Sequence, residues 1–248
     1  MPSPPPSPLP ENAGLAFIGE APWPKARLTA RQAAVLEMAG NATGRPNADV
    51  IRRLVGFESG HIRRQAQVDF PLYFNEQEAS LYAGPFETLR TNRARSWLNP
   101  HAIPELRTAL SKLDRYLATP LASAYPDWNW LDSELLPDAT LLAVAREDDF
   151  IHGVLRSRCF NRWWHTFSGT MSRPAVVTAF PFPWPPSTLL GSLSREQEEQ
   201  RHAVARAVRT GDQSALDTAV ANAYRWADDL SDDEVISGLT ALNGRRSR

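Results

Sequence analysis

The sequence has 248 residues, of which 42% are hydrophobic, and this is enough for one large domain or two modest domains with real cores. The formal net charge is -1, so nucleic-acid binding cannot be inferred from the total charge. The single cysteine excludes an internal disulfide framework, and no apolar run approaches the roughly 20 residues of a membrane span. We therefore expect a cytoplasmic protein without a membrane partner.

The charged residues are distributed unevenly along the chain. Basic residues outnumber acidic residues between Arg45 and Arg115, whereas acidic residues dominate from Ser194 to Asn243. This pattern is typical of a region that faces a polyanion, followed by a solvated helical region. Nearly all the basic residues are arginine, which makes bidentate contacts to phosphate or guanine, although a GC-rich genome would produce the same bias.

The chain begins with a proline-rich leader over residues 1–13, which we expect to be disordered. Mixed α and β elements follow as far as about residue 184. Capping boxes predict two helix starts, at Thr29 with Gln32 and at Asn75 with Glu78. We expect Pro85 to interrupt the second helix, and a further helix to begin at Pro104. The predicted strands are Leu15–Ile18, Val50–Val55, Ile62–Phe70, Tyr116–Tyr125, Trp128–Asp132 and Thr140–Ala145.

The region from Leu136 to Pro186 contains the residue types that most invite a chemical interpretation. Asp148 and Asp149 could bind a metal, but acids at the positive end of a helix explain the pair better. His152 and Cys159 lie seven residues apart on this helix and could form a thiol–imidazole pair. The favoured interpretation is a small buried cysteine in an apolar stripe that continues to Trp163.

The aromatic residues of this region, Trp163, Trp164 and those of the Phe-Pro-Phe-Pro-Trp-Pro-Pro segment, could stack on nucleic-acid bases. We favour a role in packing one domain against another. The five histidines show no zinc-type spacing with the lone cysteine. No catalytic, cofactor-binding or metal-binding residue is therefore assigned.

After residue 187 the composition changes to helix-forming residues. Capping boxes at Ser194 with Gln197 and at Ser231 with Glu234 mark the first and last of about three helices. We predict an α+β fold, with a mixed sheet-and-helix domain over residues 14–187 and a small all-helical domain over residues 188–248.

Five segments, in the same order, resemble segments of the MmeI-like adenine-specific DNA methyltransferases of combined restriction-modification systems. They are NATGRPNADVIRRLV (41–55), VDFPLYFNEQEASLYAGPFETLR (68–90), the helix-strand-strand stretch 106–138, the stretch 136–186 with GVLRSR and FPFPWPP, and YRWADDLSDDEVISGLTALN (224–243). In that family such segments lie in the target-recognition region and the terminal tail. The resemblance, from Gly14 to Asn243, implies a DNA target-recognition domain over residues 14–187. It implies double-stranded DNA and a methyltransferase catalytic subunit as partners.

The motifs that the family uses for catalysis do not occur in this sequence. Asn99-Pro100 continues as His101, so there is no Asn-Pro-Pro-aromatic motif, and neither lysine follows two residues after a glutamate as the family's nuclease centre requires. We therefore expect that the chain alone neither methylates nor cleaves DNA, and that S-adenosylmethionine would bind a separate catalytic core. The stretch between Trp164 and Phe180 is also shorter than the family pattern.

Nine arginines are the candidates for DNA contact, because phosphate contact needs only a positive side chain within reach. They are Arg52, Arg53, Arg63, Arg64, Arg93, Arg95, Arg158, Arg162 and Arg173. The function predicted from the sequence and the resemblance is sequence-specific recognition of duplex DNA, as the detached C-terminal part of an MmeI-like adenine-specific DNA methyltransferase. Two alternatives are a protein-interaction module that docks on a methyltransferase subunit, and a nonfunctional gene remnant.

Overall fold

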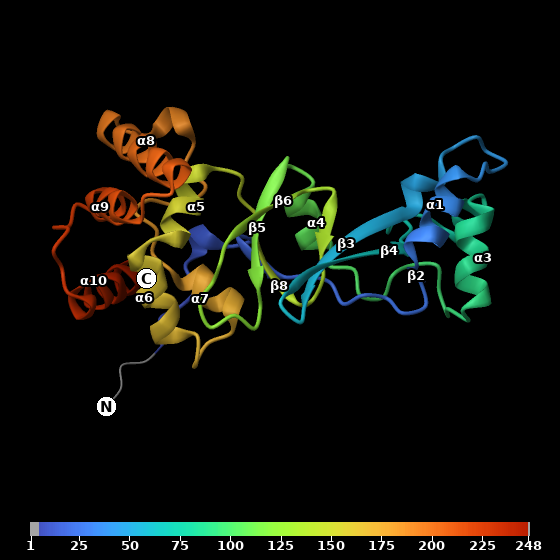
Figure 1. The fold of residues 1–248 in the computed structure, drawn as a ribbon, viewed down its shortest axis with the longest axis horizontal. Helices are drawn as coiled ribbons and strands as arrows, with labels where there is room; N and C mark the ends of the chain where they lie inside the picture. Colours follow the sequence, from blue (N-terminus) through green and yellow to red (C-terminus); the bar gives the residue numbers. More distant parts are fainter. Residues whose placement is uncertain (1–4, 248) are drawn as a thin grey trace. The chain divides into compact units, whose positions relative to one another are not determined.

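The computed structural model describes residues 5–247, and it has the α+β fold that the sequence predicts (Figure 1). Contacts between residues divide the chain into two compact units. We call residues 5–17, 109–131 and 142–247 the helical unit, and residues 18–108 and 132–141 the hairpin unit. The expected boundary near residue 187 does not separate these units, because the helices on both sides of it share one hydrophobic core.

The hairpin unit is built on a four-stranded sheet with the order β2-β4-β3-β7. Strand β3 pairs antiparallel with β4 and parallel with β7. Its elements are β2 (Arg27–Leu28), α1 (Ala30–Met38), the 3-10 helix η2 (Asn47–Val50), β3 (Ile51–Glu58), β4 (His61–Val68), α2 (Glu76–Ser80), α3 (Ala83–Thr91), the start of α4 (Pro104–Leu110) and β7 (Leu135–Pro137).

The two longest strands, β3 and β4, form a tight hairpin that extends from α1 and α3 (Figure 1). Ser59 and Gly60 connect them with φ angles of 51° and 84°. Two successive positive φ angles are the backbone of a type I′ turn, whose twist matches that of a β-hairpin. At the opposite end of the hairpin, Ile51 and Val68 are buried in a core with residues of α1 and α3.

The helical unit contains a second four-stranded sheet, with the order β1-β8-β5-β6, and most of the helices. Its elements are the 3-10 helix η1 (Pro10–Asn12), β1 (Ala16–Ile18), β5 (Arg115–Pro120), β6 (Asn129–Asp132), β8 (Leu141–Val144), α5 (Asp149–Arg156), α6 (Arg158–Phe167), α7 (Arg173–Ala179), the 3-10 helix η3 (Leu190–Ser192), α8 (Arg195–Thr210), α9 (Gln213–Ala223) and α10 (Asp232–Arg246).

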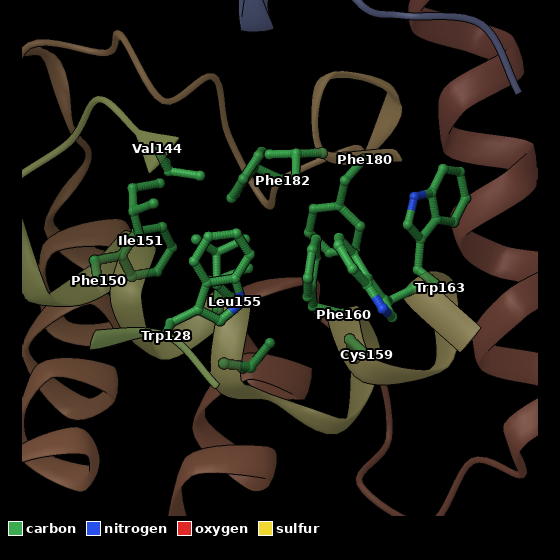
Figure 2. Close-up of a cluster of buried hydrophobic side chains, with 14 of the residues drawn as sticks. Trp128, Val144, Phe150, Ile151, Leu155, Cys159, Phe160, Trp163, Phe180 and Phe182 are labelled. Carbon is green, nitrogen blue, oxygen red and sulfur yellow. The ribbon is translucent and has the colours of Figure 1, made fainter. Parts of the chain in front are cut away.

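Large aromatic side chains form the core of the helical unit (Figure 2). Phe160, Trp163, Phe180 and Phe182 are almost completely buried, and the Trp163 indole N–H donates to the Val176 carbonyl at 2.9 Å. A buried indole needs such a partner. The aromatic residues of the FPFPWPP segment therefore pack within the core of the helical unit, where they are buried and cannot stack on bases.

The four predicted capping boxes, at Thr29, Asn75, Ser194 and Ser231, are all confirmed. Two other local expectations are wrong. The helix expected after Asp148 and Asp149, with an apolar stripe as far as Trp163, is broken at Ser157, whose hydroxyl caps a new helix, α6. Pro85 does not interrupt a helix, because it is the third residue of α3, where a missing N–H leaves no hydrogen bond unmade.

The expected disorder of the leader is also wrong for residues 5–13, while residues 1–4 lie outside the described residues. Leu9 is buried, and its N–H donates to the Thr178 carbonyl at 2.9 Å. The Asn12 amide is buried and donates to the Thr178 and Phe180 carbonyls at 2.9 and 2.8 Å. Apart from the short 3-10 helix η1, this proline-rich segment is irregular, and Leu9 and Asn12 hold it against the end of α7.

Candidate nucleic-acid interface

The β3–β4 hairpin carries four of the predicted arginines, two on each face. Arg53 lies opposite Ala66, and Arg64 lies opposite Val55. Directly opposed residues share a face and successive residues alternate, so Arg53 and Arg64 point to the same side of the sheet. Arg52 and Arg63 point to the other side.

Arg53 and Arg64 line a groove together with Arg27, and we call it the arginine groove. It has a volume of about 480 Å³, and its remaining lining residues are Leu28, Thr29, Ala30, Gln65, Ala66 and Leu135. None of these described lining residues is acidic. The groove therefore combines an apolar floor with three guanidinium groups.

The three arginines of the groove differ in their intramolecular partners. Arg53 forms an ion pair with Glu37, which lies on α1. Arg27 and Arg64 are exposed and form no ion pair with any of the residues from 5 to 247. The N-terminus of α1, capped by Thr29, also lines the groove and has no acidic residue in its first turn. Free guanidinium groups and the positive end of a helix both favour a bound anion.

The other face of the hairpin is organised by a buried carboxylate, Asp138. Its side chain is fully buried and accepts hydrogen bonds from Arg63 Nη2 at 3.2 Å and Gln65 Nε2 at 3.3 Å. It also accepts hydrogen bonds from the backbone N–H and the hydroxyl of Thr140. Gly56, which lies opposite Arg63 in the register, leaves the space that this carboxylate occupies.

A second buried cluster lies in the same unit and consists of Glu20, Arg107 and Asp69. Arg107 makes a bidentate pair with Glu20, at 2.7 Å from Nε and 2.8 Å from Nη2, and its Nη2 is 2.9 Å from Asp69. Burial raises the pKa of Asp69, and the Arg107 guanidinium opposes this shift. Arg52 is held more loosely, with Nε 3.8 Å from Asp69 and 45% of its side chain exposed. A buried carboxylate needs such partners, so we infer that this cluster stabilises the fold and does not bind a ligand.

Arg93 and Arg95 are exposed in the loop after α3 and do not line the arginine groove. Arg93 has a φ of 55°, which is uncommon for a residue other than glycine. Its N–H donates to the Arg90 carbonyl, and the Ala94 N–H donates to the Leu89 carbonyl, so the left-handed residue ends the helix. These two arginines are therefore positive and accessible, but they do not share a site with the arginines of the hairpin.

Arg158, Arg162 and Arg173 belong to the helical unit, and each has a partner there. Arg158 and Arg162 both pair with Asp232, each at 2.7 Å. The Arg173 guanidinium carbon lies 4.7 Å from the centre of the Trp164 ring. These contacts join α6 to α10 and α7 to α6, so all three arginines have a structural role.

The structural interpretation also holds for the candidate nucleophile. Cys159 is buried, and burial raises the pKa of its thiol to about 12, so it is a poor nucleophile at neutral pH. His152 is buried, and burial lowers its pKa. Its Nε2 lies 3.1 Å from the Trp128 carbonyl, to which it donates in the neutral form. The side chain of Asp148 caps α5.

Arg27 is the site residue that sequence reasoning missed. In the sequence, the polar residues Lys25 and Arg27 alternate with the apolar residues Ala26 and Leu28, immediately before the Thr29 capping box. In the structure the two polar residues are exposed and the two apolar residues are buried. This alternation indicates an edge strand with its polar side in solvent.

Within residues 5–247 no group of three or more potential ligands could hold a metal, and no helix is both long and apolar enough to cross a membrane.

No protein-family model matches this sequence, and no curated protein matches it. Among solved structures, the fold is similar to that of the type IIL restriction-modification enzyme MmeI in complex with DNA, with a TM-score of 0.57 and 15% sequence identity. The similarity covers 98% of this chain and 36% of the MmeI chain. The chain therefore has a fold related to about a third of that enzyme.

Proposed function

We propose that this chain recognises duplex DNA sequence-specifically, as the target-recognition part of an adenine-specific DNA methyltransferase of a restriction-modification system. The observation that carries the proposal is the arginine groove on the β3–β4 hairpin. The similarity to a structure solved with DNA, over 98% of the chain, supports the same proposal.

The groove supplies the kind of contact that holds a protein on the DNA backbone. Arg27 and Arg64 are free to approach phosphate oxygens, and Arg53 would exchange Glu37 for a phosphate. Such contacts fix the position of a protein on the duplex but do not read its sequence. In this proposal, base reading comes from other side chains of the hairpin unit.

Catalysis is assigned to a different part of the system. S-adenosylmethionine would bind a methyltransferase core that is separate from this sequence, and that core would be the protein partner. The chain spans 36% of the MmeI chain, so a division of labour between recognition and methyl transfer is consistent with that comparison.

The experiment is a fluorescence-anisotropy titration of the purified chain with mixed-sequence duplex DNA at 50 and 200 mM salt. If three groove arginines contact phosphates, the logarithm of the association constant should fall with that of the salt concentration with a slope of roughly -3. A folded chain that binds no duplex at the lower salt concentration would contradict the proposal. Docking on a methyltransferase subunit would then be the function to test.

A further inference from the structure

Arg63 differs from the other arginines of the hairpin in how firmly it is held. Its Nη2 donates to Asp138 at 3.2 Å, and its Nη1 lies 3.2 Å from Glu58. Its neighbour Arg64 is exposed and has no such partner among the described residues. The same hairpin therefore presents one fixed guanidinium and one free guanidinium, on opposite faces.

The carboxylate that fixes Arg63 is itself immobile. The Asp138 side chain is fully buried, and its backbone N–H donates to the Val55 carbonyl at 2.7 Å. The N–H of Thr140 holds one carboxylate oxygen at 2.9 Å. A side chain at position 56 would collide with this group, since a Cβ atom there would lie 2.0 Å from Asp138 Oδ2. Glycine at that position is therefore part of the arrangement.

Glu58, the second partner of Arg63, can move away. It is the last residue of β3, and 60% of its side chain is exposed, compared with 32% for Arg63. An exposed ion pair of this kind contributes little to stability. Another acceptor can therefore replace Glu58 while Asp138 keeps the guanidinium in place.

Building on the proposed function, we infer that Arg63 is a specificity-determining residue that reads a guanine edge in the major groove, and that Asp138 is its positioning residue. Beyond the residues that pair with β2 and β7, the end of the β3–β4 hairpin at residues 56–63 is a two-stranded β-ribbon, and such a ribbon fits the major groove. Guanine presents two acceptors there, O6 and N7, which match the planar fork of arginine. A guanidinium group that is already held in place loses less conformational entropy on binding. Phosphate contact has no such geometric requirement, and Arg64 suits it better.

The test is selection of duplexes from a random library by the full-length chain and by Arg63→Lys, with Arg64→Lys as the matched control. Both substitutions keep the charge and remove the planar fork. We expect wild type to select a site with guanine at one or more positions. Arg63→Lys should lose the preference at one guanine by about tenfold or more. Arg64→Lys should keep every preference.

Two further variants separate positioning from charge. Asp138→Asn, if it folds, should lose the same guanine preference as Arg63→Lys, although Arg63 is still present. Glu58→Gln should raise the affinity for the selected site by about two- to fivefold, because a competing carboxylate is removed. If Asp138→Asn does not fold, the comparison of the two lysine variants decides alone.

The outcomes distinguish this inference from the proposed function. Wild type that binds no duplex overturns both. Wild type that selects a site, together with Arg63→Lys that selects the same site with equal preference, overturns only the assignment of Arg63. Binding of wild type without any base preference also overturns this assignment, while the phosphate-contact role of the arginine groove stands.

Discussion

At the scale of single residues, the sequence identifies the arginine-rich strands but not the partners that decide what each arginine does. Arg63 and Asp138 are 75 positions apart, and Arg158 and Asp232 are 74 positions apart. No local pattern connects such residues, because the fold brings them together. The sequence therefore predicted nine equivalent cations, whereas the structure contains free, loosely paired and firmly held ones.

Gly56 offers a direct test of the buried carboxylate. A Cβ atom at this position would lie 2.0 Å from Asp138 Oδ2, whereas one at Gly169 would meet nothing within 4 Å. We expect Gly56→Ala to lower the free energy of unfolding by about 1–3 kcal/mol, because the Asp138 network must shift. Gly169→Ala is the control, with an expected change within about 0.5 kcal/mol. Urea denaturation measures both, and equal midpoints for the two variants would contradict this account.

At the scale of elements, the sequence predicts helix and strand ends most accurately where the signal is local. The four capping boxes each involve two residues three positions apart, and all four begin a helix. The Ser59-Gly60 turn was also predictable, because serine followed by glycine between two predicted strands is a turn signal. The packing of the leader was not, because it depends on the Thr178 and Phe180 carbonyls more than 160 positions away.

The break between α5 and α6 shows how a pattern can conceal a boundary. The apolar stripe continues from Ile151 to Trp163, so periodicity predicts one helix. Ser157 interrupts it, with a hydroxyl that donates to the Val154 carbonyl at 2.7 Å and accepts from the Phe160 N–H at 3.4 Å. The side chain thus serves the end of α5 and the start of α6.

Ser157→Ala should therefore destabilise the helical unit. The Ser157 side chain is buried, and its removal leaves the first turn of α6 without a cap. We expect a loss of about 0.5–2 kcal/mol in the free energy of unfolding, measured by urea denaturation. The matched control is Ser157→Thr, which keeps the hydroxyl and should recover part of the loss. Full stability of the alanine variant would show that the cap is unimportant.

At the scale of the whole molecule, the sequence predicted the α+β class, and the contacts between residues group the chain differently from the predicted boundary near residue 187. The helical unit draws on three separate segments, and the hairpin unit lies between them in the sequence. Composition changes near residue 187, where helix formers begin, but α8 packs on α5, across that change. Amino-acid composition reflects the local preference for helix or strand, whereas a compact unit is defined by contacts between segments that are distant in the sequence.

The most direct test of DNA recognition is the salt dependence of duplex binding by two matched triple variants. One removes the groove cations, Arg27→Ala, Arg53→Ala and Arg64→Ala. The other removes three arginines of α8 in the helical unit, Arg195→Ala, Arg206→Ala and Arg209→Ala. Both lower the charge by the same amount, so a difference between them reports the location of the contacts.

We predict that the groove variant binds mixed-sequence duplex at least tenfold more weakly than wild type at 50 mM salt. The slope of its salt dependence should be smaller in magnitude by roughly 2–3, since about 0.9 is expected per phosphate contact. The α8 variant should stay close to wild type in both measures. Equal losses in the two variants, or wild-type binding by the groove variant, would contradict the central claim that the β3–β4 hairpin holds DNA.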